Sequence, residues 1–351
     1  MRILVGLSGG FDSAYTAMLL ANEGHTVEGA VLDMHCYTEI TEAKETADSL
    51  GIPFHVIPCR ELFDREVVEN FCDAYAMACT PNPCIVCNER VKFRALYDYA
   101  MAQGFDRIAT GHYANVVRKN GRLTVAVAKD HVKDQSYMLY RLPEEILEKL
   151  LLPMGDIIKK EAKKDETCLS IGAVEREESQ DICFIKGEGH AEYIERRRGA
   201  LVHGDFVSES GEVLGHHRGI VRYTVGQRKG LGVSAASRLF VKEIDPASNR
   251  IILSDRAPDH RVFCIKDVVF SGMRKEEALT STDLRVRVRY STPAVGASLY
   301  LENDRLWVRL AESSRCAVTP GQSAVFYVDD CVVFGGIIDY TPINGNNNQK
   351  M

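Results

Sequence analysis

The sequence predicts an α/β protein with a helix-covered parallel sheet, then a small mixed domain, then a C-terminal antiparallel β-barrel. Three observations predict this class. The 351 residues exceed the usual size of one domain. Strand-like and helical patterns alternate over the first hundred residues, and apolar and polar residues alternate in short runs from about residue 262. We expect domains at residues 1–186, 187–260 and 261–343, and a disordered tail at 344–351.

Strands and helices alternate in the first domain. The predicted strands are residues 2–7, 27–34, 52–57 and 107–110. The predicted helices are residues 13–23, 42–50, 59–77 and 91–103. Such alternation builds a parallel sheet, whose ligands bind beyond the carboxyl ends of its strands.

The pattern changes near residue 150. Residues 156–170 predict a charged helix, residues 179–185 a short strand, and the stretch that follows is rich in Gly, Arg and His. Further on, apolar residues alternate with Arg285, Arg287 and Arg289, which we expect on a solvent-exposed strand face. Further predicted barrel strands are residues 297–301, 306–310, 323–328 and 332–338.

Composition excludes several classes of protein. Hydrophobic residues make up 45% and charged residues 26%, and no window approaches the roughly 18 apolar residues of a membrane span. Met1 leads into a strand without a targeting leader, so we expect a cytoplasmic protein with no membrane partner. Eleven cysteines in such a chain do not indicate a disulfide scaffold. The net charge of −6 means that any RNA partner needs local basic patches.

A glycine-rich turn joins the first strand to the first helix. It consists of Gly6, Leu7, Ser8, Gly9, Gly10, Phe11, Asp12 and Ser13. Glycines let the backbone approach a phosphate, and the free amides and dipole of a helix start favour an anion. Asp12 repels phosphate, which suggests either Mg²⁺ or a capping role. No Gly-Lys-Ser/Thr follows, so this is not a Walker loop.

A cysteine pair follows an Asn-Pro step. Asn82 is placed to cap a helix whose first residue is Pro83, so that Cys84 and Cys87 share one face of its first turns. A helix start lowers the pKa of a thiol, so either cysteine is a candidate nucleophile or metal ligand. Zinc is a rival interpretation, but no second Cys-x-x-Cys pair exists and Cys183 stands alone.

Six motifs occur in one order: SGGFDS, TPNPCIVCNERVKF, ATGHYA, KDQSYMLYRL, ESQDICFI and YTVGQRKGLGV. The first resembles the loop of the PP-loop ATP pyrophosphatases, which adenylate a substrate oxygen. Together the six resemble the tRNA-specific 2-thiouridylases, which thiolate the wobble uridine of certain tRNAs. The resemblance runs from residue 3 to about residue 340.

The resemblance implies a role for each matching residue. Cys87 matches the nucleophilic cysteine and Cys183 the cysteine that carries a persulfide from a donor protein, with a disulfide between them as an intermediate. The glycine-rich turn matches the ATP loop, and Met34 and Gly111 match positions near adenine and ribose. The positions that match tRNA or target-base contacts are Asn82, Pro83, Cys84, Lys133, Asp134, Gln135, Arg289 and Tyr290.

One position departs from the family pattern. Many relatives carry Asp where this chain has Cys84, so the proton-moving role of that carboxylate does not transfer. Three cysteines, at 84, 87 and 183, then allow a second mechanism, in which a [4Fe–4S] cluster delivers sulfide. Both mechanisms use ATP and Mg²⁺ to activate the uracil C2 oxygen.

Two basic segments also predict RNA contacts. Arg196, Arg197 and Arg198 form one cluster, and Arg222, Arg228 and Tyr223 belong to a second segment free of acidic residues. Tyr223 either stacks on a base or packs in the fold. Two other functions stay open: a PP-loop ligase acting on a small molecule, and a tRNA-binding module without adenylation.

Overall fold

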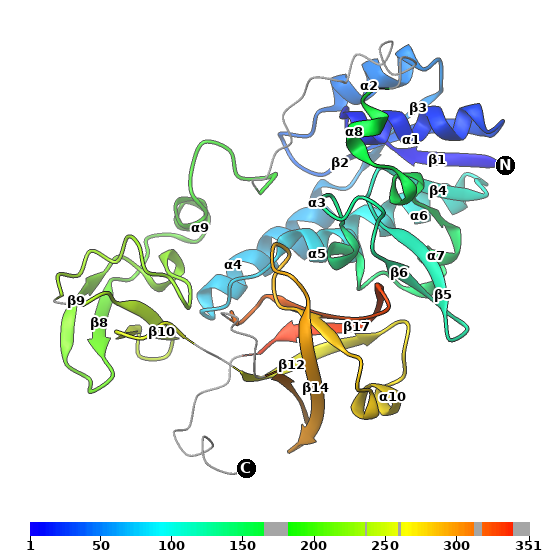
Figure 1. The fold of residues 1–351 in the computed structure, drawn as a ribbon. Coiled ribbons are helices and arrows are strands. Elements are labelled where there is room, and N and C mark those ends of the chain that lie inside the picture. The colour runs from blue at the N-terminus through cyan, green and yellow to red at the C-terminus, as the bar shows by residue number, and fades with distance from the viewer. Residues whose placement is uncertain (165–181, 236, 259–260, 312–317, 340–351) are drawn as a thin grey trace.

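The computed structural model describes residues 1–164, 182–235, 237–258, 261–311 and 318–339. Figure 1 shows the parallel-sheet part at the upper right, the small mixed part at the left and the barrel below them. The expected α/β class, with a parallel sheet, a mixed sheet and an antiparallel barrel, is confirmed. The predicted tail at 344–351 lies outside the described residues.

The first sheet has the strand order β3-β2-β1-β4-β7, and its neighbouring strands run parallel. Its strands are β1 (Arg2–Gly6), β2 (Thr26–Asp33), β3 (Phe54–Pro58), β4 (Arg107–Thr110) and β7 (Leu150–Leu151). The chain leaves β1 toward β2 on one side and returns to β4 on the other. The carboxyl ends of β1 and β4 are therefore the place where ligands bind in sheets of this topology.

Helices cover both faces of this sheet because apolar side chains leave the central strand in both directions. Ile3 and Val5 pack against Ala17 of α1 (Phe11–Asn22), whereas Leu4 belongs to the core on the opposite face. The period of two along a strand produces this division. Burial of both faces fixes the sheet and, with it, the turn that follows β1.

Two helical runs, separated by residues 77–82, link the first sheet to the rest of the molecule. They comprise α3 (Arg60–Phe63), the π-helical turn η1 (Asp64–Val68), α4 (Glu69–Ala76), α5 (Pro83–Cys87), the π-helical turn η2 (Asn88–Lys92) and α6 (Phe93–Ala102). Figure 1 shows α4 extending from the parallel-sheet part toward the mixed part. π-helical turns are frequent at functional sites, and here one of them begins directly after Cys87.

Two local predictions around residue 160 differ from the structure. The described part of 156–170 contains only α8 (Lys159–Ala162), after the 3-10 turn η4 (Pro153–Asp156). The expected strand at 179–185 is wrong over its described part, since residues 182–185 form a turn. Phe184 is buried there among the rings of Phe63, Phe71 and Tyr193. The apolar residue that suggested a strand therefore packs against helices and not in a sheet.

The mixed part holds one helix and a four-stranded sheet of order β10-β11-β8-β9. Its elements are α9 (His190–Arg198), β8 (Gly204–Ser208), β9 (Val213–His217), β10 (Phe240–Asp245) and β11 (Arg250–Ser254). The pairing of β11 with β8 is parallel and the other pairings are antiparallel. A separate small core forms around Phe206, Val241 and Ile251.

Six antiparallel strands close the barrel through the pairing of β12 with β17. They are β12 (Val262–Phe270), β13 (Arg285–Arg287), β14 (Val295–Glu302), β15 (Arg305–Leu310), β16 (Ser323–Val328) and β17 (Cys331–Ile338). Leu284, Val286 and Val288 are buried in the core, as their alternation predicts. A hairpin from the first half of the chain, β5 (Asn115–Lys119) and β6 (Arg122–Ala126), pairs with β17 and joins the barrel to the parallel-sheet part.

Candidate active site

The glycine-rich turn lies at the carboxyl end of β1, and hydrogen bonds of its two serines hold it together. The backbone amide of Ser8 donates to the Ser13 hydroxyl at 3.1 Å, and that hydroxyl donates to the Gly10 carbonyl at 3.0 Å. Gly9 has a φ of +73°, which a residue with a side chain rarely adopts. No side chain caps α1 at Gly10. The resulting amide-lined start of α1 suits an anion.

Gly111, which follows β4, packs closely against the backbone of this turn. A methyl group in place of its hydrogen would lie 2.6 Å from the carbonyl carbon of Asp12 and 2.7 Å from the amide nitrogen of Ser13. Only a glycine therefore lets the end of β4 approach the turn so closely.

Asp12 accepts two hydrogen bonds within the turn region. The Tyr113 hydroxyl donates to its Oδ1 at 2.7 Å, and the Lys159 ammonium donates to its Oδ2 at 2.7 Å. The sequence suggested Mg²⁺ or a capping role for Asp12. In the structure its side chain serves neither as a helix cap nor in any metal-holding group of three or more His, Cys, Asp or Glu among the described residues.

The cysteine pair begins its helix as the sequence predicts. The Asn82 side chain accepts a hydrogen bond from the Cys84 amide at 3.1 Å, and Pro83 is the first residue of α5. Cys84 is exposed and Cys87 is buried, with its Sγ 3.8 Å from Sδ of Met34 at the end of β2. Met34 therefore touches the cysteine site from the sheet side.

Cys183 joins this cysteine site from a distant part of the chain. It is exposed in the turn that precedes the buried Phe184. The three thiols are close enough to interact electrostatically: Cys183 and Cys84 both raise the pKa of Cys87, and Cys84 raises the pKa of Cys183. The structure thus brings together the two cysteines to which the sequence assigned the chemistry.

The expectation that the helix start lowers the pKa of Cys84 or Cys87 is wrong. Desolvation by the surrounding protein raises the pKa of Cys87 to about 12, and it also raises the pKa values of Cys84 and Cys183. The start of the short helix α5 does not offset this loss of hydration. The thiols are therefore neutral at pH 7 in this arrangement.

The described residues give no geometric support to a [4Fe–4S] cluster at the three cysteines. No group of three or more His, Cys, Asp or Glu in the described part of the chain is arranged to hold a metal ion, and that part includes Cys84, Cys87 and Cys183.

Three family models match the chain in order. Residues 1–187 match the tRNA methyl transferase HUP domain, 191–255 the tRNA methyl transferase PRC-barrel domain, and 260–338 the aminomethyltransferase beta-barrel domain. A tRNA-specific 2-thiouridylase MnmA 2 of Clostridium botulinum is 36% identical, and an MnmA of Clostridium perfringens is 37% identical. Each alignment covers 96% of this chain and 98% of the relative. The chain belongs to the MnmA family. This confirms the family that the six motifs predicted.

Of the positions expected to contact tRNA, Asn82, Pro83 and Cys84 lie at the start of α5, and the others lie in the segment before η3 (Ser136–Leu139) and after β13. Asp134 is buried, and its carboxylate accepts a hydrogen bond from the guanidinium of Arg287 in the barrel at 2.7 Å. The Gln135 side-chain oxygen accepts a hydrogen bond from the Tyr113 amide at 2.9 Å. Arg289 donates to Thr319, and Tyr290 packs near the Tyr137 ring. Lys133, next to Asp134, is partly exposed. Asp134 and Gln135 thus each make a hydrogen bond within the fold.

The arginines of the barrel strand are not all exposed, contrary to expectation. Arg285 is exposed, but Arg287 bonds to Asp134 and also donates to the Tyr290 carbonyl at 2.6 Å. Arg287 contacts the parallel-sheet part through Asp134, and Arg289 contacts Thr319 in the loop before β16, so both are only partly exposed.

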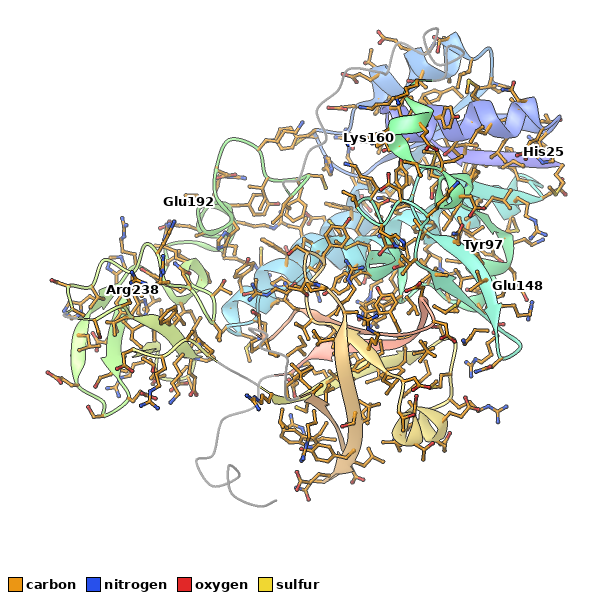
Figure 2. The ribbon with its side chains drawn as sticks, in the orientation of Figure 1. His25, Tyr97, Glu148, Lys160, Glu192 and Arg238 are labelled. Atoms are coloured by element: carbon orange, nitrogen blue, oxygen red, sulfur yellow. The ribbon has the colours of Figure 1, made fainter. Side chains whose placement is uncertain are left out.

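The predicted basic clusters are largely neutralised. Arg197 and Arg198 of α9 bond to three acidic side chains of η1 and α4, namely Asp64, Glu69 and Asp73. Arg222 pairs with Glu192, which Figure 2 marks on α9. Tyr223 is buried against Phe206 and His217, so packing explains it. Arg228 is exposed and remains a candidate phosphate contact.

Two cationic residues of the site escaped the sequence analysis. Lys159 bonds to Asp12 from α8. Lys92, at the end of η2, lowers the pKa values of Cys84, Cys87 and Cys183 against the larger effect of burial. Lys92 lies in the same motif as Cys87, five residues further on. The sequence did not indicate the π-helical turn that follows Cys87 and ends at Lys92.

No helix in the described part of the chain is long and apolar enough to cross a membrane.

Proposed function

We propose that this protein thiolates C2 of the wobble uridine of tRNA, using ATP and a cysteine persulfide. The observation that carries the proposal is the convergence of Cys183 and Cys87 beside Met34, at the carboxyl edge of the sheet that also bears the glycine-rich turn. Membership of the MnmA family, whose relatives are named tRNA-specific 2-thiouridylases, supports tRNA as the substrate.

The nucleotide half of the reaction uses the turn from Gly6 to Ser13. ATP binds with its phosphates at the start of α1, and Mg²⁺ is held by these phosphates as their counter-ion. The uracil C2 oxygen attacks the α-phosphate and pyrophosphate leaves, so the poor leaving group becomes AMP. Met34 and Gly111 border the nucleoside.

The sulfur half uses the two cysteines. A donor protein transfers sulfane sulfur to Cys183, which then carries a terminal –SH on its sulfur. The Cys87 thiol gives its proton to the departing sulfur and bonds to Cys183, so that a Cys87–Cys183 disulfide forms and sulfide is released. The sulfide attacks C2, AMP departs, and a reductant restores both thiols.

Mass spectrometry of tRNA nucleosides tests the proposal. The chain is incubated with tRNA, ATP, Mg²⁺ and a persulfide donor, with and without added iron. We expect 2-thiouridine and AMP in equal amounts without iron. Product that appears only with iron would replace the persulfide route by a cluster route. AMP formed without RNA would instead indicate a small-molecule ligase, and RNA binding without AMP formation a binding module.

A further inference from the structure

A buried lysine lies beside the glycine-rich turn and has no role in the reaction described so far. Lys159 is the first residue of α8, and only 8% of its side chain is exposed. Its neighbour Lys160 is exposed. Figure 2 marks Lys160 on α8, which lies next to α1 in the view. Two adjacent lysines on one short helix thus have opposite surroundings.

Contacts on several sides hold Lys159 in place. Its backbone amide donates to Asp130 at 3.0 Å, and its ammonium lies 5.7 Å from the centre of the Tyr113 ring. Ala162, on the same helix, packs with Phe11 of α1 in one apolar cluster. The lysine head is therefore fixed relative to the start of α1.

The ammonium reaches the turn at its single acidic residue. Lys159 Nζ lies 2.7 Å from Asp12 Oδ2, and the Tyr113 hydroxyl holds the other carboxylate oxygen at 2.7 Å. A buried lysine is costly unless it is paired, and Asp12 provides the pair. An unpaired carboxylate at this point would repel a triphosphate, whereas the neutralised pair does not.

We propose that Lys159 is a further nucleotide-binding residue, which contacts the phosphates that leave as pyrophosphate, and that Asp12 and Tyr113 position its ammonium. The proposal rests on the use of ATP proposed above. It assigns to a protein side chain the positive charge that the sequence led us to seek in a metal ion at Asp12. An ammonium is a point charge suited to phosphate oxygens.

Binding of ATP, pyrophosphate and AMP to the full chain, measured by calorimetry with Mg²⁺, tests this role. Lys159→Met should weaken ATP and pyrophosphate about tenfold or more, as expected when a charge-assisted hydrogen bond is lost. AMP lacks the β- and γ-phosphates, so its affinity should stay unchanged. Lys160→Met, the matched control, should leave all three affinities unchanged.

Further variants separate binding from folding. Lys159→Arg keeps the charge and should recover part of the ATP affinity. The double variant Asp12→Asn/Lys159→Met removes both partners of the ion pair, so neither charge is left unpaired, and it should still bind ATP no better than the single variant. Wild-type ATP affinity in the double variant, or an equal loss for ATP and AMP in Lys159→Met, overturns the role of Lys159. If the wild-type chain binds no ATP at all, the proposed function fails first.

Discussion

The two halves of the candidate active site have opposite chemical surroundings. The nucleotide half is polar: serine hydroxyls and backbone amides bond within the turn, and Asp12 is paired with Lys159. In the cysteine half Cys87 is buried, and loss of hydration raises the pKa values of Cys87 and of the more exposed Cys183. The nucleotide half is thus ready for an anion, whereas the cysteine half keeps its thiols in the less reactive protonated form.

The two halves therefore present different chemical groups to their substrates. The nucleotide half offers backbone amides at the start of α1, whereas the cysteine half offers protonated thiols. In the proposed route, the sulfur that is transferred is the outer sulfur of the Cys183 persulfide and not the sulfur of the buried Cys87 thiol. The comparison therefore predicts that variants of one half leave the other half intact.

The largest expected effect is the loss of thiolation in Cys183→Ser. The proposed route requires a persulfide on this sulfur, so 2-thiouridine should fall below detection by nucleoside mass spectrometry. ATP affinity should stay at the wild-type value, because the nucleotide half does not include this residue. Cys331→Ser, in a barrel strand, serves as the control and should retain activity. Full thiolation by Cys183→Ser would remove this cysteine from the chemistry.

The pH dependence of thiol alkylation has the next largest effect. The pKa of Cys183 is raised above the ordinary value of 9.0, so its thiolate fraction grows about tenfold per pH unit from pH 7 to pH 9. Iodoacetamide labelling of Cys183, followed by peptide mass spectrometry, should rise about a hundredfold over this range. The urea-unfolded chain provides the reference and should level off at lower pH. A plateau below pH 8 in the folded chain would contradict the desolvated cysteine half.

A smaller effect is expected for Gly111→Ala. The added methyl group meets the backbone of Asp12 and Ser13, and overpacking of this kind costs about 1–3 kcal/mol. ATP affinity measured by calorimetry should fall about tenfold, since each 1.4 kcal/mol is about tenfold in affinity. Alkylation of Cys183 should not change. Gly215→Ala, where a methyl group meets only an ordinary contact at 3.5 Å, should bind ATP normally. A loss of both properties would show that the halves are coupled.

The smallest effect is expected for Met34→Leu, at the boundary between the halves. Met34 Sδ lies 3.8 Å from the Cys87 Sγ, and a volume-conserving apolar exchange costs less than about 1.5 kcal/mol. ATP affinity and 2-thiouridine yield should each stay within about tenfold of wild type. A complete loss of thiolation with normal ATP binding would instead give the Met34 sulfur a part in the chemistry.

Local features of the site could be predicted from the sequence. The glycines of the turn, the cap at Asn82 and the first helical position of Pro83 depend on neighbours within a few residues. Their preferences follow from backbone geometry and from the unpaired amides of a helix start. Tertiary contacts decide other features: Arg287, expected on an exposed face, bonds to Asp134, 153 residues away in sequence.

The sequence by itself determined the strand–turn–helix at Gly6–Ser13, the barrel alternation and the family, because short-range patterns and ordered motifs carry that information. Only the tertiary structure decided that Lys159 pairs with Asp12, that the hairpin of β5 and β6 joins the barrel, and that the thiol of Cys87 is buried. Pairing, burial and local dielectric depend on which distant segments pack together, and no local pattern encodes that packing.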